Sequence, residues 1–117
     1  MRKFDVKTIE IQLKDMCEYF VQNAYGVELD IPVLINNRLK RSLGRFIEKA
    51  GKAYRIEFSG MLLTNGTEEQ IMSVLKHECI HYALFKLGRN HRDGQEDFEN
   101  ELLKYGSHST NSLHVKR

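Results

Sequence analysis

The sequence predicts a single α+β domain, and three observations predict it. The chain has 117 residues, of which 41% are hydrophobic and 29% are charged, as is typical of one globular core. Long segments near both ends of this core have helical periodicity, and short β-rich runs lie between them. We therefore expect an N-terminal helix, a small sheet, a second long helix beneath it and a closing helix. These elements form one domain over residues 1–105, and a polar, flexible tail follows over residues 106–117.

The first helix and the sheet follow from two different periodicities. Apolar residues at steps of three and four predict a helix from about residue 6 to residue 25, which Gly26 ends. The run 31–35 predicts a short strand, because its proline suits the start of a strand or an edge position. Residues 45–49 and 53–58 flank a turn, and the second run alternates apolar with charged residues. We expect a hairpin here, with one solvated face.

The second long helix carries more specific signals. Thr67 and Gln70 fit a capping box after an Asn-Gly turn, so the helix begins near Glu68 and runs to Gly88. Its apolar stripe includes Glu78, and a buried carboxylate without a partner is costly. A last short helix is expected over residues 95–105, with these apolar residues turned inward: Phe98, Leu102 and Leu103.

Composition excludes several classes of protein. No apolar run is long enough to span a bilayer and the first residues form no apolar signal segment, so we expect a soluble, cytoplasmic protein that is monomeric by default. Cys17 and Cys79 form no C-x-x-C pair, so we expect buried thiols and no thiolate metal site. The 18 basic and 16 acidic residues are too balanced to indicate a nucleic-acid binder by bulk charge. A local basic cluster still allows weak, non-specific DNA contact. It consists of Arg38, Lys40, Arg41 and Arg45.

The second long helix contains the motif H-E-x-x-H at residues 77–81. His77 and His81 are one helical turn apart, so both imidazoles lie on one face and can bind a single tetrahedral Zn²⁺. Glu78 lies one step round the helix, beside the metal, where it can act as general base for a metal-activated water. The motif therefore predicts zinc-dependent hydrolysis of peptide bonds, with one Zn²⁺ per chain.

A catalytic zinc ion needs a third protein ligand. The metzincin extension is excluded, because Leu84 and Leu87 occupy the positions where it requires Gly and His. Two candidates remain. His91 lies just beyond the helix stop, and Glu101 lies on the last helix at a spacing similar to that of thermolysin-like gluzincins.

Other polar side chains near the motif are candidates for supporting roles. Asp93 or Glu96 can orient a zinc-bound imidazole through its free N–H. Tyr54 and Tyr82 are candidates for donating a hydrogen bond to a developing oxyanion. We interpret both tyrosines instead as core residues whose hydroxyl groups are satisfied.

The sequence resembles the SprT-like metalloprotease family over roughly residues 31–103. The resemblance rests on the H-E-x-x-H helix, the break at Gly88, the segment His91-Arg92-Asp93-Gly94 and the aromatic Phe98. Upstream, residues 36–45, the strand around Ile56 and the pair Leu62-Leu63 follow the order of that family.

This resemblance implies that His77, His81 and His91 bind zinc and that Glu78 is catalytic, with a protein or peptide as substrate. The chain departs from the family in two ways. Family members commonly have His-Gly where this chain has His91 followed by Arg92. Larger relatives also carry a cysteine-rich zinc ribbon that handles DNA, so we expect a minimal catalytic domain without that ribbon.

The resulting prediction is a zincin-like zinc metalloendopeptidase that cleaves poorly structured protein segments, which pair with a sheet edge near the cleft. Two alternatives remain open. The first is a non-catalytic, zinc-stabilised binding module, DNA-associated or not, which has no use for Glu78 as a base. A metal-free, DNA-associated domain depends instead on the basic cluster, including Arg41.

Overall fold

The computed structural model describes residues 3–107 of the chain, and it confirms the expected α+β class. The first element is the long helix α1 (Lys3–Tyr25), which starts a few residues earlier than the sequence predicts. Gly26 follows it with φ +65°, the left-handed conformation in which many helices end. Residues 108–117, which make up most of the expected tail, lie outside the described part of the chain.

The sheet has three strands in the order β1-β3-β2. β1 (Val33–Asn36) runs parallel to β3 (Lys52–Ser59), and β2 (Gly44–Lys49) pairs with β3 in the antiparallel sense. The expected hairpin is thus confirmed, and its turn uses positive φ at Ala50 and Gly51. Because β2 is an edge strand, one side of its backbone pairs with no described strand.

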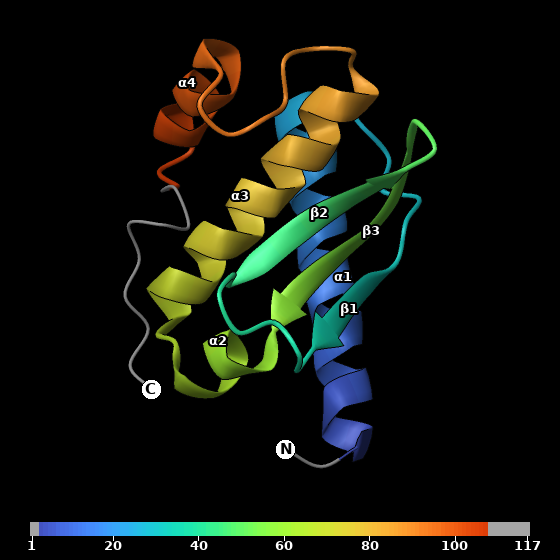
Figure 1. Cartoon of the computed structure of the whole chain (residues 1–117), viewed down its shortest axis with the longest axis vertical. Coiled ribbons are helices and arrows are strands. Elements are labelled where there is room, and N and C mark those ends of the chain that lie inside the picture. The colour runs from blue at the N-terminus through green and yellow to red at the C-terminus, as the bar shows by residue number, and fades with distance from the viewer. Residues whose placement is uncertain (1–2, 108–117) are drawn as a thin grey trace.

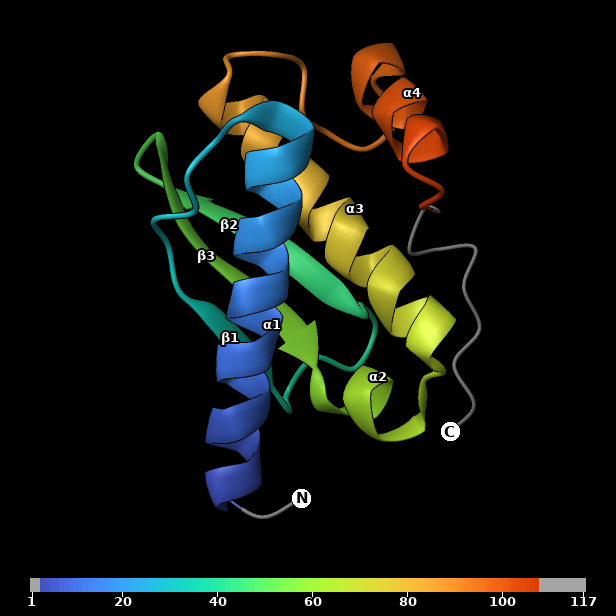
Figure 2. The same cartoon turned by 180° about the vertical axis from the view of Figure 1, so that it is seen from behind.

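Two long helices cover one face of the sheet (Figures 1 and 2). One is α1, and the other is α3 (Glu68–Lys86), which packs against β2, β3 and α1. The capping box of α3 is confirmed: Thr67 Oγ1 accepts the N–H of Gln70 at 3.1 Å, and Gln70 Oε1 accepts the N–H of Thr67 at 2.9 Å. The short helix α2 (Gly60–Asn65) precedes it, and the sequence analysis did not predict this helix.

The main core lies between α1, α3 and the inner face of the sheet. It includes Leu13, Cys17, Val21, Ile56, Phe58, Val74, Leu75 and Cys79. Cys17 and Cys79 are buried free thiols, as predicted. Because Cys79 faces this core, the neighbouring positions of α3 on its other side face the sheet edge and α4. The core thus fixes the direction in which the H-E-x-x-H motif points.

Tyr82 and Tyr54 differ from each other in burial. Tyr82 is fully buried, and its hydroxyl donates to the carbonyl of Glu28 at 2.6 Å, which confirms the prediction. Tyr54 is 42% exposed, so its assignment to the core was wrong. It lies near the hairpin turn, where the cationic groups of Lys49 and Arg55 lie over its ring instead of core side chains.

The last helix, α4 (Glu96–Lys104), packs against α3 and buries Phe98 and Leu102, as expected. Leu103 is 78% exposed, so its expected inward direction was wrong, because one residue further along a helix turns the side chain about 100° away. Beyond α4, the Ser107 hydroxyl donates to the carbonyl of Ser73 at 2.6 Å and holds the chain on α3. Among the described residues, no helix is long and apolar enough to cross a membrane.

Candidate metal centre

The two histidines of the motif lie side by side on α3, as their spacing predicts. His77 is 1% exposed and His81 is 9% exposed. Their Nε2 atoms are 3.1 Å apart, so the lone-pair nitrogens of both rings converge on one point. Such a pair of buried imidazoles costs desolvation energy unless a proton or a cation lies between them.

Asp93 completes a group of three converging ligand atoms. It follows α3 in the loop before α4, and its Oδ1 atom lies 3.0 Å from His77 Nε2 and 3.5 Å from His81 Nε2. Ligands at 2.0–2.1 Å around a tetrahedral Zn²⁺ are about 3.3 Å from one another. The three separations therefore fit a tetrahedral ion of this size. Among the described residues, only these three form such a group of potential metal ligands.

The second nitrogen of His81 fixes the orientation of its ring. His81 Nδ1 contacts the backbone carbonyl oxygen of His91. Because a carbonyl can only accept, Nδ1 carries the proton of this contact, and Nε2 is the nitrogen that faces His77 and Asp93. This is the usual arrangement around a metal-bound imidazole, whose free N–H is held by a carbonyl or a carboxylate.

Glu78 lies on the floor of the same cleft and is 2% exposed. Burial raises the pKa of its carboxyl group to about 7, and the charge of Asp93 adds to this, while the charge of His81 and a hydrogen bond from the Phe46 backbone oppose it. Gly44 makes this placement possible, because a Cβ atom there would lie 3.2 Å from Glu78 Cγ and 2.9 Å from Val74 Cγ1. The edge strand β2 can thus pass directly beside the carboxylate.

A cleft of about 510 Å³ opens above these groups, between α3 and the edge strand β2. Besides the motif and Asp93, it is lined by Ser42, Gly44, Arg45, Phe46, Glu48, His91 and Arg92. One open cleft is therefore lined by a buried acid, two imidazoles and a second carboxylate, that of Asp93, whose side chain is 68% exposed. An extended backbone can enter this cleft alongside β2.

The structure separates the two candidates for the third ligand. His91 lines the cleft, but its ring packs edge-on against Phe85, and its Nε2 atom lies 3.9 Å from Glu48 Oε1. Glu101 is outside the cleft: its Oε1 atom accepts the hydroxyl of Tyr25 at 2.8 Å, and its Oε2 atom lies 3.5 Å from Arg89 Nη2. The structure thus brings His77, Glu78, His81 and Asp93 together, places His91 at the wall and leaves Glu101 elsewhere.

Sequence reasoning considered Asp93 only as a residue that orients an imidazole. One signal in the sequence could have indicated Asp93 as a ligand. It lies two residues after the candidate ligand His91, in the loop that connects α3 to the last helix. Glu96 had the same status in the sequence, and it is not part of the converging group. Spacing alone cannot choose between neighbouring loop residues, because a loop has no fixed periodicity.

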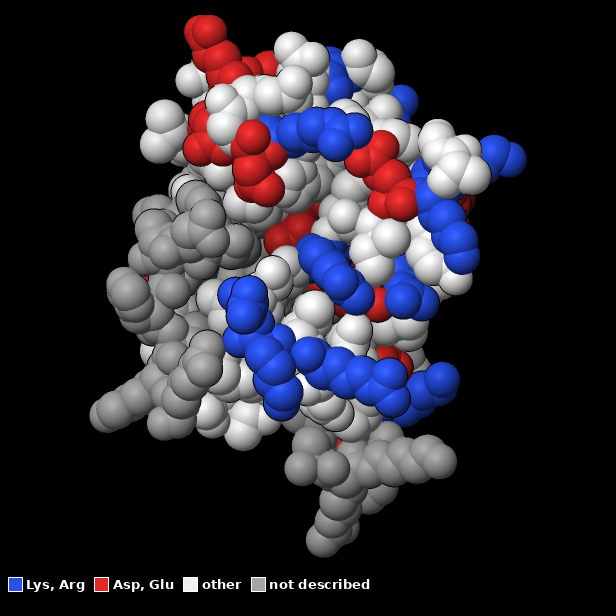
Figure 3. All heavy atoms as spheres, in the orientation of Figure 1, with Lys and Arg blue, Asp and Glu red and all other residues white. Residues whose placement is uncertain are grey.

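The basic cluster lies on the face of the molecule that also holds the cleft. Its four members, Arg38, Lys40, Arg41 and Arg45, are exposed and belong to the segment before β2 or to the start of β2. Figure 3 shows basic side chains gathered over this region, with acidic atoms in the hollow above them. Arg45 is also tied down, because its Nε donates to Glu57 Oε1 at 2.6 Å.

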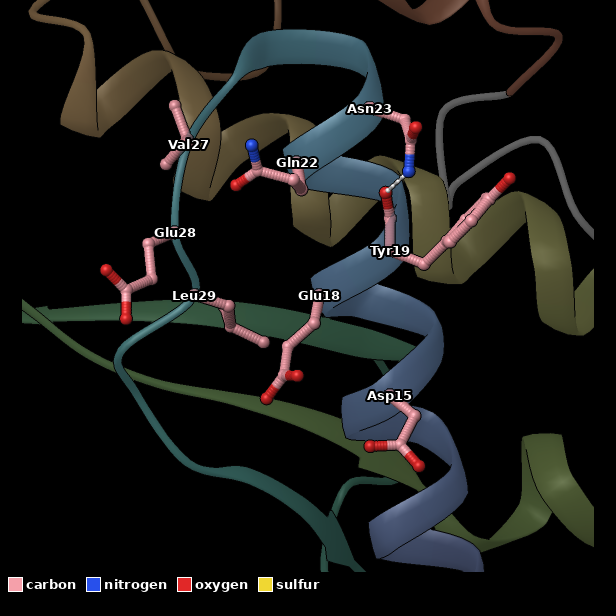
Figure 4. A pocket seen from close by; sticks show the side chains of 8 residues that line it. All are labelled: Asp15, Glu18, Tyr19, Gln22, Asn23, Val27, Glu28 and Leu29. Carbon is pink, nitrogen blue, oxygen red and sulfur yellow. Dashed lines mark hydrogen bonds between the residues drawn. The ribbon is translucent and has the colours of Figure 1, made fainter.

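A second hollow, of about 470 Å³, lies between α1 and the segment 27–29 (Figure 4). Three carboxylates line it, from Asp15, Glu18 and Glu28, and Tyr19 at its edge is 72% exposed. Figure 4 shows these side chains spread around the hollow. They do not form a group of converging ligand atoms. This hollow is similar in volume to the cleft, but its described lining residues form no candidate metal site.

The fold and the site together define an α+β protein with a candidate His-His-carboxylate metal centre on its second long helix. Comparison with known proteins confirms the resemblance: the SprT-like family model matches residues 12–116, and the chain belongs to the SprT-like family. No solved structure matches the chain at a significant level.

Several bacterial proteins named Protein SprT-like are similar to this chain. The one from Streptococcus mutans is 27% identical over 94 residues, which are 80% of this chain and 63% of the relative. The one from Bacillus cereus is 37% identical over 71 residues, which are 61% and 44%. The one from Geobacillus kaustophilus is 27% identical over 96 residues, which are 82% and 62%. The match thus spans less than two thirds of each of these relatives.

Proposed function

We propose that this protein is a zinc-dependent metalloendopeptidase with a zincin-like fold, acting on protein substrates in the cytoplasm. The observation that carries the proposal is the convergence of His77, His81 and Asp93 beside the buried carboxylate of Glu78. The donor set suits zinc, since imidazole nitrogen and carboxylate oxygen are both common zinc ligands. One Zn²⁺ per chain is expected.

The bound zinc and Glu78 have different roles in the proposed reaction. When bound, zinc supplies an electrophile that activates water at neutral pH and polarises a carbonyl group. The Glu78 carboxylate takes the proton of the attacking water and passes it to the leaving nitrogen. Its burial supports the role as base, because desolvation raises the pKa of the carboxyl group and makes the carboxylate more basic.

The third metal ligand comes from the loop between α3 and α4. Asp93 has its oxygen atom in place, and His91, which the family resemblance implies, lines the same cleft. Both residues belong to the same loop, so substituting each one in turn tests zinc binding and the choice of the third ligand in one experiment. We retain His91 as the prediction from resemblance and Asp93 as the ligand supported by the geometry.

The substrate is expected to be a poorly structured protein segment. The edge strand β2 borders the cleft, and its unpaired backbone side can hydrogen-bond to an extended chain. Backbone pairing recognises the peptide main chain, so side-chain specificity is expected to be low. A folded domain does not fit, because its backbone groups are already paired.

The basic cluster supports a second, separate role. Four exposed basic residues beside the cleft can bind DNA phosphates without sequence preference, and this binding would fall steeply as salt increases. Arg41→Ala is expected to weaken such binding and to reduce its salt dependence. If DNA binding is absent, or is unaffected by Arg41→Ala, this role is wrong, and the peptidase proposal is unaffected.

The test of the main proposal combines metal analysis with proteolysis. Wild-type protein should contain near-stoichiometric zinc and should cleave an unfolded protein, with or without DNA present. Glu78→Gln should retain zinc and lose cleavage. A zinc-loaded wild type that cleaves nothing would leave the non-catalytic, zinc-stabilised module as the function, and a protein that binds no zinc after metal is added back would exclude both.

A further inference from the structure

The helix α4 places one aromatic ring against both histidines of the metal centre. Phe98 is fully buried, and its ring centroid lies 4.0 Å from that of His81, with the two planes only 14° apart. The same ring meets His77 nearly edge-on, at 5.2 Å and 80°.

α4 is itself held in place by polar contacts at both of its ends. Arg89, in the loop after α3, donates to Asp97 Oδ2 at 3.0 Å, near the start of α4. Tyr25, at the end of α1, donates to Glu101 Oε1 at 2.8 Å, near the end of α4. Leu102 packs in the same cluster as Phe98. These contacts fix α4 relative to α3, so Phe98 has little freedom to move away from the imidazoles.

An imidazole needs such a constraint. The χ2 torsion of histidine has a broad, roughly two-fold distribution, so an unrestrained ring samples orientations in which Nε2 points away from a metal. A parallel ring at 4.0 Å blocks rotation of the His81 plane, since the ring edges would collide. The contact between His81 Nδ1 and the His91 carbonyl then selects which nitrogen faces the site.

We infer that Phe98 is a positioning residue for the metal centre: its ring fixes the planes of His81 and His77 so that both Nε2 atoms point to one metal position. The inference rests on the proposed function in one respect, namely that the ion bound there is zinc. It assigns α4 a task beyond closing the core. It also gives Glu101 a task, which is to anchor the helix that carries Phe98.

Leu102 offers a matched control. It lies on the same face of α4, is 3% exposed and packs in the same apolar cluster, but has no ring to stack on an imidazole. If Phe98 contributes only apolar packing, substitutions at the two positions should affect zinc binding equally. If it positions the ligands, only the substitution of Phe98 should weaken zinc binding strongly.

The experiment measures zinc affinity by competition with a chromophoric chelator, together with the unfolding midpoint of the zinc-free protein. Phe98→Leu keeps an apolar side chain and removes the flat ring, and we expect its zinc affinity to fall by about 10- to 100-fold, the range seen when partners of metal ligands are removed. Leu102→Ala should lower the unfolding midpoint and keep zinc affinity within about twofold of wild type. Co²⁺ substitution should show a changed absorption spectrum in Phe98→Leu alone.

The inference is overturned if Phe98→Leu binds zinc as tightly as wild type, or if Leu102→Ala weakens binding to the same extent. A wild type that binds no zinc overturns the proposed function and this inference together, so the two failures are distinguishable. If Phe98→Leu does not fold, Phe98→Met, which also removes the flat ring and keeps an apolar side chain, decides. In that variant, a zinc affinity equal to that of wild type overturns the inference, and a loss of about 10-fold or more supports it.

Discussion

Two buried carboxylates, Glu57 and Glu78, lie on opposite sides of the same sheet and differ in the direction of their pKa. Glu57 is on β3 between the core residues Ile56 and Phe58, so its side chain points to the face that α1 and α3 do not cover, and Glu78 is on α3. Both are 2% exposed. Burial raises the pKa of each, but hydrogen bonds from Asn36 and Arg45 and the charges of Arg45 and Arg55 bring that of Glu57 below its ordinary value. The pKa of Glu78 remains raised, at about 7.

The difference shows which buried carboxylate has enough hydrogen bonds and cationic partners in the fold and which one lacks them. Glu57 lies 2.6 Å from the Nε atoms of both Arg45 and Arg55, and it accepts a hydrogen bond from Asn36 at 3.0 Å. Its partners come from neighbouring strand positions, so it serves the fold. For Glu78, the charge of His81 lowers the pKa, but it does not offset the effect of burial. A metal ion among those imidazoles would complete its surroundings.

The largest expected effect is on catalysis by Glu78. Glu78→Gln keeps the size of the side chain and removes the base, so the rate of cleavage of an unfolded protein should fall by about 10²- to 10⁴-fold while zinc content stays at the wild-type level. The matched control is Glu18→Gln, in the hollow beside α1, which should leave the rate unchanged. Cleavage that survives in Glu78→Gln would remove the contrast between the two buried carboxylates.

The next effect concerns the third ligand. If Asp93 binds the metal, Asp93→Ala should weaken zinc binding by more than about 100-fold, because losing a ligand costs more than losing the partner of a ligand. His91→Ala should then have a smaller effect, since the contact with His81 Nδ1 uses the His91 backbone. Metal analysis and chelator competition on both variants decide. The opposite ranking would mean that the loop rearranges on zinc binding and that the resemblance implies the right ligand.

Glu57 should control stability in acid. Its folded-state pKa lies below the ordinary value of 4.5, so its contribution to stability is present above that pH and is lost as the pH falls towards the folded-state pKa. Glu57→Gln should be less stable than wild type by about 1–3 kcal/mol near pH 7, as is typical of hydrogen bonds to charged groups. The gap should narrow below about pH 4.5. Urea unfolding at several pH values measures it, and a constant gap would contradict the assignment.

A last effect, similar in size to that of Glu57→Gln, is expected at Gly44, which lies between the backbone of Glu57 and the side chain of Glu78. A Cβ atom there would lie 3.2 Å from the backbone oxygen of Glu57 and 3.2 Å from Glu78 Cγ, and 2.9 Å from Val74 Cγ1. Gly44→Ala should therefore cost about 1–3 kcal/mol of unfolding free energy, the usual range for overpacking. Because β2 must move away from α3 in this variant, the rate at which it cleaves an unfolded protein should also fall. A stable, fully active Gly44→Ala would show that the strand and the carboxylate are not closely coupled.

Local signals predicted much of the fold. The capping box at Thr67 fixed the start of α3, and Gly26 marked the end of α1, because both depend on contacts within a few residues of the chain. The short helix α2 was missed, since its six residues form less than two turns and present no periodicity. The inward direction of Leu103 and the burial of Tyr54 were wrong, because each depends on what another element covers.

The sequence by itself determined the chemistry of the helix: the four-residue spacing places His77 and His81 on one face, and Glu78 follows one step round, wherever that helix is packed. It also determined the family, which the match over residues 12–116 confirmed. Only the tertiary structure decided that Asp93 meets the two imidazoles, that Glu101 anchors α4 and that Phe98 stacks on His81. Helical geometry relates residues within one element at fixed angles, whereas contacts between a loop and two helices depend on how those elements pack.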